Sequence, residues 1–166
     1  MEWIGRGSEK RGDPQLVLSG ARSVIVLALN YWQGDLLGPN EPGRGRIARY
    51  AWGADYHEVL EPKLRELDRL LRAEGGEQRF YTDTGPALER DFGAEAGIGW
   101  HGKSTMLLNR ELGTWFFLSE ILTTLQLSPD PRRLSAAGAA PVASTPARRA
   151  RLQLLTGSMP VFAFPT

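Results

Sequence analysis

The stretch SVIVLALN, from Ser23 to Asn30, decides the fold class of this chain. It is an unbroken run of β-branched and aliphatic side chains of strand length, bounded by Gly20 on one side and by a loop containing Gly34 on the other. Such a run is typical of a β-strand that is buried on both faces. We therefore expect a sheet that is covered on both sides.

The clearest helix follows this strand in the sequence. Between Tyr56 and Glu74 apolar residues recur at spacings of three and four, Asp55 is a suitable N-cap, and Gly75 is a suitable end. The apolar positions are Val59, Leu60, Leu64, Leu67, Leu70 and Leu71. Residues 43–55, which precede the helix, show neither the spacing of a helix nor the alternation of a strand. We expect them to form an ordered loop, the kind of segment that often carries function.

Strands and helices then alternate. Residues 78–82 predict a short strand, and residues 86–96 predict a helix that Pro86 opens and Gly97 closes. Three later segments are also candidates for strands, the first two pairing with each other: residues 104–109, 114–118 and 119–127, the last of which also suits a short helix. The sequence thus predicts an α/β protein with a mixed sheet flanked by helices.

The composition excludes several classes of protein. The chain has 166 residues, enough for one domain with a sizeable core. It has no cysteine, which excludes disulfides, a thiolate nucleophile, and a zinc or iron–sulfur site ligated by cysteines of this chain. No apolar run approaches the ~20 residues needed to span a bilayer, and the start lacks the apolar core of a signal peptide. We therefore expect a cytoplasmic monomer with no membrane partner.

Two different compositions are joined in the chain. The 20 basic and 19 acidic residues give a net charge of +1, yet residues 131–166 hold five arginines and no acidic residue. That segment is rich in alanine and proline and has no periodicity, which is typical of a disordered tail. We expect an α/β domain over residues 1–130, incomplete at its amino-terminal end, and an unstructured basic Ala/Pro/Arg-rich tail over residues 131–166.

The segment YTDTGPALER, from Tyr81 to Arg90, places a carboxylate where a predicted strand ends. Sites gather at strand ends in α/β sheets, and an aspartic acid there can hold or donate a proton if burial raises its pKa. Asp83 is therefore a candidate acid. The alternative is that Asp83 only caps the helix that begins near Pro86, while Glu89 and Arg90 lie on a solvated face.

Two segments rich in glycine or aromatic residues are candidate binding loops. GIGWHGKST, residues 97–105, lacks the spacing of a P-loop; its backbone amides and Lys103 suit an anionic or amide-rich cofactor, or the segment is a plain glycine-rich turn. RYAWGADYH, residues 49–57, gathers aromatic side chains that can stack on bases or on a flat macrocycle. His57 and Asp55 are too few ligands for a metal, so we predict no metal site there.

Five segments resemble one known family in their order and spacing. They are MEWI, RGDPQLVLSGARSVIVLALNY, GRIARYAWGADYH, YTDTGPALERDFGAEAGIGWHGKSTMLLN and GTWFFLSEILT. Over about residues 1–130 the chain is similar to the amino-terminal cobalamin-binding region of epoxyqueuosine reductase. The resemblance implies an enzyme that reduces epoxyqueuosine at the wobble position of a tRNA to queuosine, using cobalamin and two four-iron four-sulfur clusters.

The resemblance also implies roles for particular residues. Asp83 matches the family's proton donor, which protonates the departing epoxide oxygen, and Arg90 would approach the tRNA. The residues that would line the cobalamin are Arg49, Tyr50, Asp55, Tyr56, His57, Gly102, Lys103 and Ser104. A buried aspartic acid beside a large apolar cofactor would have its neutral form favoured by desolvation, as a proton donor requires.

The chain departs from the family pattern at both ends. MEWI lies internally in the family, so we expect that this chain begins late, and the family continues after SEILT with C-G-x-C-x-x-C-x-x-x-C-P-T. Read as degenerate codons in a shifted frame, residues 136–150 permit C-G-S-C-T-R-C-L-D-A-C-P-T-G-A, so we expect residues 131–166 to be out-of-frame translation. A genuine basic tail that binds RNA is the alternative, and sequencing the gene across codons 125 to 140 decides between them.

The sequence therefore predicts a fragment of a cobalamin-dependent, iron–sulfur epoxyqueuosine reductase. Because the chain has no cysteine to ligate the clusters that would deliver electrons, we expect it to be inactive alone. The alternative is a non-catalytic corrinoid-binding or RNA-binding module, in which Asp83 is only a helix cap.

Overall fold

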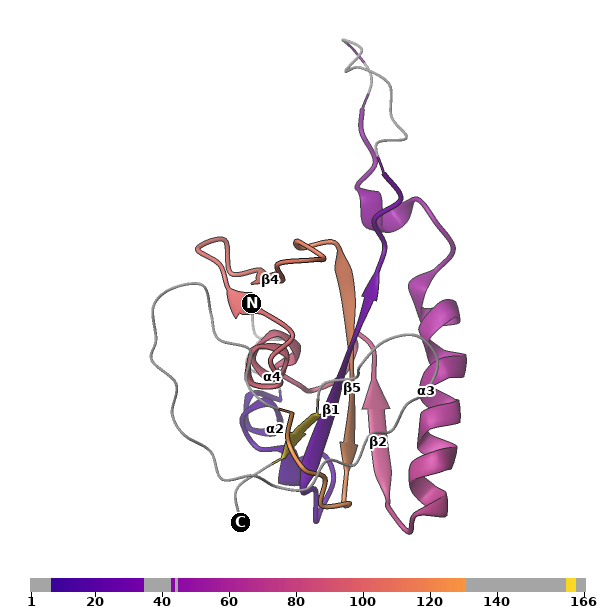
Figure 1. Cartoon of the computed structure of the whole chain (residues 1–166), viewed down its shortest axis with the longest axis vertical. Helices are drawn as coiled ribbons and strands as arrows, with labels where there is room; N and C mark the ends of the chain where they lie inside the picture. Colours follow the sequence, from indigo (N-terminus) through magenta and orange to yellow (C-terminus); the bar gives the residue numbers. More distant parts are fainter. Residues whose placement is uncertain (1–6, 35–42, 44, 131–160, 164–166) are drawn as a thin grey trace.

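A four-stranded sheet forms the centre of the molecule (Figure 1). The computed structural model describes residues 7–34, 43, 45–130 and 161–163. The strands are β1 (Ser23–Asn30), β2 (Gln78–Tyr81), β5 (Phe116–Thr123) and β6 (Val161–Ala163), in the order β2-β5-β1-β6. The buried strand expected at Ser23–Asn30 is confirmed, and the α/β class with it.

The direction of the strands differs from the expectation. Strands β1 and β2 run the same way, but β5 lies between them and is antiparallel to both, and β6 is antiparallel to β1. Every strand pair in the described residues is therefore antiparallel, and the prediction of a mixed sheet was wrong on this point. The pattern of alternating strands and helices does not reveal which later strand is inserted between two earlier ones.

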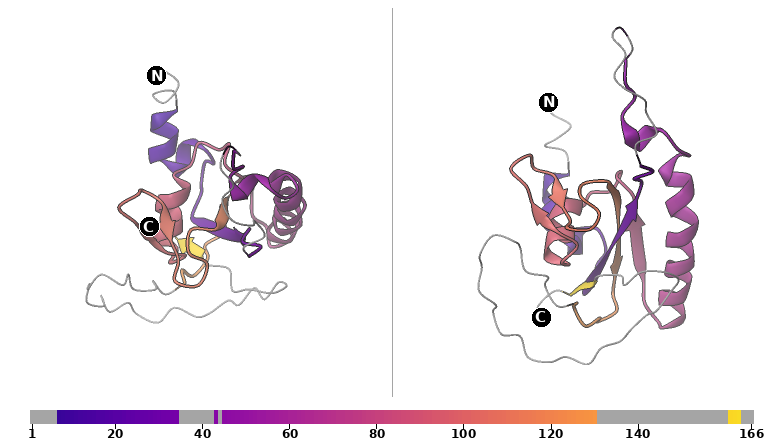
Figure 2. Two further views of the ribbon diagram at one scale, coloured as in Figure 1. Left: turned by 90° about the horizontal axis from the view of Figure 1, so that it is seen from above. Right: turned by 45° about the horizontal axis from the view of Figure 1, so that its top comes forward.

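Helices and turns cover both faces of the sheet. The long helix α3 (Tyr56–Ala73) lies on one face, while α2 (Ser8–Gly12) and α4 (Glu89–Glu95) lie on the other (Figures 1 and 2). A small hairpin of β3 (Trp100–His101) and β4 (Leu107–Leu108) adjoins α4, and two single turns, η1 (Pro14–Leu16) and η2 (Arg49–Ala51), complete the elements described. None of the described helices is long and apolar enough to cross a membrane.

Helix α3 seals its face of the sheet with leucines. Its buried residues Leu60, Leu64, Leu67 and Leu71 pack with Ile25 of β1 and Ile121 of β5. The helix begins as expected, because the Asp55 carboxylate accepts the backbone N–H of His57 at 2.9 Å. It is followed by Gly75, which has a φ of 85° that suits glycine.

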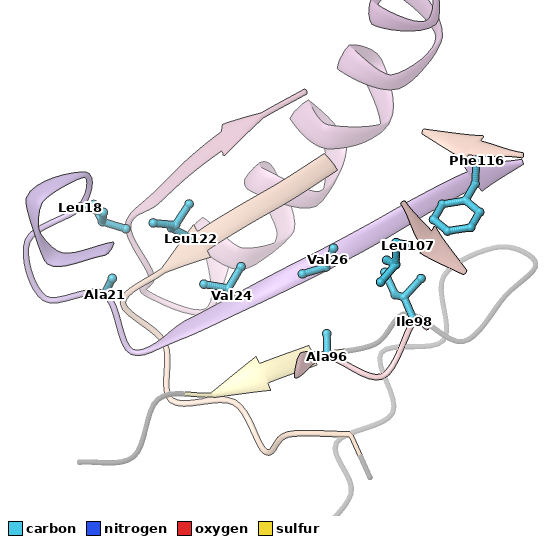
Figure 3. Packing of buried hydrophobic residues seen from close by; sticks show 9 residues of the cluster. All are labelled: Leu18, Ala21, Val24, Val26, Ala96, Ile98, Leu107, Phe116 and Leu122. Carbon is cyan, nitrogen blue, oxygen red and sulfur yellow. The ribbon is translucent and has the colours of Figure 1, made fainter. Parts of the chain in front are cut away.

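The opposite face has a second core, assembled from many short elements (Figure 3). Its central strands present the alternate residues Val24, Val26 and Leu122. Phe116 joins them from the start of β5. The other buried members come from the residues after η1, from the end of α4 and from the hairpin region: Leu18, Ala21, Ala96, Ile98 and Leu107. Successive side chains of a strand point to opposite faces, so Val24 and Val26 lie in this cluster whereas Ile25 lies in the cluster under α3.

Helix α4 is shorter than the sequence indicates. It begins at Glu89 rather than near Pro86, and its N-cap is Leu88, which makes no side-chain capping bond. Asp83 therefore does not cap this helix, so that alternative is wrong. The expected end is confirmed, because Gly97 takes a left-handed φ of 80° directly after the C-cap Ala96.

The later strands also pair differently from the expectation. The predicted pairing of residues 104–109 with 114–118 is wrong, and the turn between them is instead closed by a bridge between Asn109 and Gly113. Strand β4 pairs instead with β3, and Phe116–Thr123 is one strand that pairs with β1 and β2. At Val161–Ala163 the chain forms a short strand where we expected no structure, while residues 131–160 and 164–166 lie outside the described part.

Candidate active site

Asp83 lies just beyond the carboxyl end of β2, in the loop that leads to α4. Its φ is 62°, a left-handed conformation that few residues other than glycine adopt. The side chain is exposed, and its Oδ2 accepts a hydrogen bond of 2.8 Å from the Tyr56 hydroxyl. The structure therefore brings together two of the residues singled out in the sequence, from the β2–α4 loop and from the first position of α3.

Aromatic stacking holds Tyr56 in place. Its ring lies 4.1 Å from that of Phe117 with an interplanar angle of 12°, and 4.1 Å from the ring of His57. Burial first, and then the hydrogen bond to Asp83, raise the pKa of Tyr56 to about 12. Tyr56 is therefore a neutral hydroxyl that donates to the carboxylate throughout the physiological pH range.

A pocket of about 380 Å³ opens beside Asp83. It is lined by Arg11, Asp83, Thr84, Gly85, Ala87, Leu88, Glu89, Arg90 and Asp91. Arg90 is exposed, as expected, and its Nη1 donates to the carbonyl oxygen of Thr105 at 2.7 Å. That bond connects the pocket to the turn of the β3–β4 hairpin.

Glu89 is not on a solvated face, contrary to the expectation. It is half-buried, and its Oε1 is a buried atom without a hydrogen-bond partner in the described residues. Burial first, and then the charge of Asp83, raise the pKa of Glu89, while a hydrogen bond from the backbone of Asp83 opposes that shift. Glu89 therefore belongs to the same site as Asp83, because the Asp83 charge acts on it and the Asp83 backbone donates a hydrogen bond to it.

Glu120 is a further member of the site that the sequence reasoning missed. It lies in the middle of β5, opposite Tyr81 of β2, and its exposed fraction is 0%. Burial, followed by the charges of Glu89 and Asp83, raises its pKa to about 9. The signal was present in FFLSEILT, where Glu120 shares the strand period of Leu118 and Leu122, both of which face the core.

The segment from Arg49 to His57 is tied together by its own contacts. The Arg49 guanidinium lies over three indole rings, those of Trp32, Trp52 and Trp115, at 4.1, 5.0 and 5.4 Å from their centroids. Tyr50 is 56% exposed. Asp55 and His57 form a contact of 2.8 Å at the start of α3, and the hydrogen bonds from His57 lower the pKa of Asp55. Asp55 is the N-cap of α3.

The candidate residues Gly102, Lys103 and Ser104 form the turn of the β3–β4 hairpin. The Gly102 amide donates to the Met106 carbonyl at 2.9 Å, and a Cβ at Gly102 would lie 2.8 Å from the Leu108 side chain. A larger residue at Gly102 would therefore require the Leu108 side chain to shift. Lys103 and Ser104 are both exposed.

The described residues fit a large polar-rimmed cofactor better than a metal ion. Lys103 and Ser104 offer exposed donors, and the exposed rings of Tyr50 and Trp115 offer flat apolar surface. The hairpin turn and η2 lie on either side of the same end of the sheet, with the pocket's loop at that end as well (Figure 1). In the described part of the chain, no group of three or more His, Asp or Glu side chains is arranged to hold a metal.

Comparisons with known proteins give one consistent result. Residues 11–84 match the family model described as epoxyqueuosine reductase QueG, DUF1730. The epoxyqueuosine reductase of Synechocystis sp. is 41% identical over 132 residues, which are 78% of this chain and 45% of that protein.

Solved structures agree with these sequence matches. A crystal structure of epoxyqueuosine reductase with an epoxyqueuosine-modified tRNA-Tyr stem loop has a TM-score of 0.71 and 32% identity, over 80% of this chain and 36% of the other. In a structure of the Bacillus subtilis enzyme, a catalytic loop that carries an aspartate is swung out of the active site. That structure has a TM-score of 0.67 and 32% identity, over 80% of this chain and 36% of the other. The chain spans less than half the length of each of these proteins.

Proposed function

Because the chain belongs to the epoxyqueuosine reductase family over the matched part, we propose that it carries the proton donor and the cobalamin-binding surface of such a reductase. The substrate would be epoxyqueuosine in tRNA. The observation that carries the proposal is the Asp83 carboxylate, which stands at the mouth of a pocket and is held by the Tyr56 hydroxyl at 2.8 Å.

Asp83 would act as the general acid. When an epoxide opens, its oxygen becomes an alkoxide that needs a proton, and a carboxylic acid within hydrogen-bond reach supplies one. Asp83 is exposed in this structure, not buried as the sequence reasoning supposed. A ligand that covers it would remove its hydration and favour its protonated form. The aspartate-bearing catalytic loop that moves in the Bacillus subtilis enzyme supports a loop role for Asp83, which also lies between a strand and a helix.

The cofactor surface would combine two segments. Arg49, Tyr50, Asp55, Tyr56 and His57 would hold cobalamin from one side and Gly102, Lys103 and Ser104 from the other. Cobalamin, when bound, supplies the electrons that open the epoxide. Lys103 and Ser104 would donate hydrogen bonds to its amide and phosphate groups, and the aromatic rings would cover its flat face.

Electron delivery would need cluster ligands from outside these 166 residues. The chain has no cysteine, so two four-iron four-sulfur clusters would have no thiolate ligand in it. We therefore expect that the chain alone binds cobalamin but does not turn over. The out-of-frame origin of residues 131–166, the cytoplasmic location and the monomeric state also stay predictions.

Arg90 would contribute to the approach of the tRNA. Its guanidinium is exposed at the pocket that Asp83 borders, and a positive group there suits a phosphate. The tRNA stem loop present in the related crystal structure supports RNA as the partner. An Arg90→Gln variant should bind the stem loop more weakly, with a smaller dependence on salt.

The test begins with cobalamin and the purified 166-residue chain, followed by visible absorbance. We expect a shifted spectrum and saturable binding. Folded protein that leaves the spectrum unchanged would refute the cofactor assignment and favour a module that only binds RNA. Asp83→Asn should leave binding intact and abolish epoxyqueuosine reduction in an enzyme restored to the alternative reading frame. If reduction persists in that variant, Asp83 is not the acid.

A further inference from the structure

Glu120 occupies a position that an apolar residue would fill at lower cost. It is completely buried on the α4 face of β5, between Leu118 and Leu122, which pack into the core on that face. Neither of its carboxyl oxygens has a hydrogen-bond partner in the described residues. A buried carboxyl group without a partner destabilises the folded state, so the core gains nothing from Glu120.

The charged groups around Glu120 are mainly acidic. Glu89 approaches from α4 and Asp83 from the loop after β2, and both act on Glu120 through their charges. Tyr81 lies opposite Glu120 on β2, and Tyr56 of α3 donates its hydroxyl to Asp83. On β1 the residue opposite Glu120 is the apolar Val26.

Two arginines, Arg11 and Arg90, line the neighbouring pocket, and neither is among the charges that act on Glu120. The charge of Arg90 acts on Glu89, and its guanidinium is bonded to the Thr105 carbonyl. With burial and two neighbouring carboxylates all favouring the neutral form, Glu120 holds a proton at neutral pH. Glu120 thus carries a proton inside the fold, whereas the Asp83 side chain is exposed to solvent.

Glu89 links the interior acid to the pocket. The backbone of Asp83 hydrogen-bonds to the Glu89 carboxylate, while Oε1 of Glu89 is buried and unpartnered, like both oxygens of Glu120. Both glutamates therefore have buried carboxyl oxygens without a partner in the described residues, and the charge of Glu89 acts on Glu120. Three carboxyl groups thus form a series from the centre of the sheet to the pocket.

We propose that Glu120 stores the proton that Asp83 delivers, and that this proton passes through Glu89 to the Asp83 carboxylate when a ligand covers Asp83. The inference rests on the proposed function of Asp83. The O–H bond of Glu120 breaks, Glu89 takes up that proton and releases one to Asp83, and Glu120 is left as a carboxylate. Loss of hydration at Asp83 supplies the driving force, and solvent water returns a proton to Glu120 after the ligand leaves. Glu120 therefore acts on the reaction only through Glu89 and Asp83, and it does not touch the substrate.

The first experiment is infrared spectroscopy of the full chain at pH 7.5. The wild type should show the carbonyl-stretching band of a protonated carboxylic acid. Glu120→Gln should remove this band, whereas Glu74→Gln, a change of the same kind at an exposed glutamate, should leave it unaltered. A wild type without the band, or a band that persists in Glu120→Gln, would overturn the proposal. Circular dichroism of each variant verifies that the fold is retained.

The second experiment tests the route of the proton. After transfer to D2O, the Glu120 band shifts when its proton exchanges with solvent, and this exchange should be about tenfold or more slower in Glu89→Gln. Equal exchange rates in Glu89→Gln and wild type would refute the route, and would leave the acid role of Asp83 untouched. Conversely, reduction that persists in Asp83→Asn would refute the proposed function even if the stored proton is observed. The two ideas therefore fail in separate measurements.

Discussion

The two faces of the central sheet are built in contrasting ways. On one face a single 18-residue helix, α3, lays a row of four buried leucines across Ile25 and Ile121. On the other, α2, the seven-residue α4, the β3–β4 hairpin and irregular turns share the covering, and a carboxyl group is buried among apolar side chains. Both faces bury apolar side chains, but the α4 face also buries an ionisable carboxyl group near the pocket, which lowers the stability of the fold.

The largest expected effect lies on the α3 face. Leu64 is 1% exposed, so Leu64→Ala should destabilise the protein by about 2–5 kcal/mol through lost burial and the cavity left behind. Val59 on the same helix is 38% exposed, and Val59→Ala should change the stability by less than about 1 kcal/mol. Urea unfolding measures both. Similar losses for the two variants would contradict the view that α3 stabilises through its buried row.

Glu120 gives the contrasting prediction on the other face. Its pKa rises from 4.5 in the unfolded chain to about 9 in the folded one, so folded protein binds the extra proton between these values. The stability is therefore complete below pH 4.5 and falls as the pH rises toward 9. Relative to Glu120→Gln, the wild type should lose up to about 1.4 kcal/mol for each pH unit in this window.

Urea unfolding of both proteins at several pH values measures this difference. Glu74→Gln, at an exposed position, is the matched control and should follow the wild type at every pH. Stability curves of wild type and Glu120→Gln that run parallel from pH 5 to pH 9 would show that Glu120 ionises normally, and the contrast between the faces would be lost.

The hairpin on the α4 face depends on a close approach of its backbone. A Cβ at Gly99 would lie 2.0 Å from the carbonyl oxygen of Leu108, so Gly99→Ala should displace the hairpin and cost roughly 1–3 kcal/mol. Gly45 has no atom within 4 Å of the corresponding position, and Gly45→Ala serves as the control. Thermal unfolding compares the variants, and a Gly99→Ala protein as stable as the control would refute this packing.

Tyr56 gives the smallest and most local effect, where the α3 face meets the pocket. Tyr56→Phe removes the hydrogen bond to Asp83 and should cost about 1 kcal/mol or less. Absorbance of the phenolate measures the pKa of Tyr56 directly. Asp83→Asn should lower this pKa from about 12 but not to 10, because burial is its largest cause. An unchanged value would mean that the two side chains do not interact in solution.

Much of the fold followed from local pattern. The β1 run and the leucine spacing of α3 were predicted at nearly their observed bounds, as were the cap at Asp55 and the end at Gly97. Each depends on residues close together in the chain, so a single stretch of sequence contains the whole signal. The resemblance to a family followed from short motifs for the same reason, and the comparisons agree with it.

The tertiary structure alone decided which groups share the site. Only the insertion of β5 between β1 and β2 places Glu120 opposite Tyr81 and near Asp83 and Glu89. Only the late start of α4 frees Asp83 from a capping role and turns Glu89 inward. Pairing of distant strands and burial of a charge depend on contacts between residues far apart in the sequence, and no local period encodes them. The sequence by itself determined the elements and the candidate acid, and the packing determined that acid's neighbours.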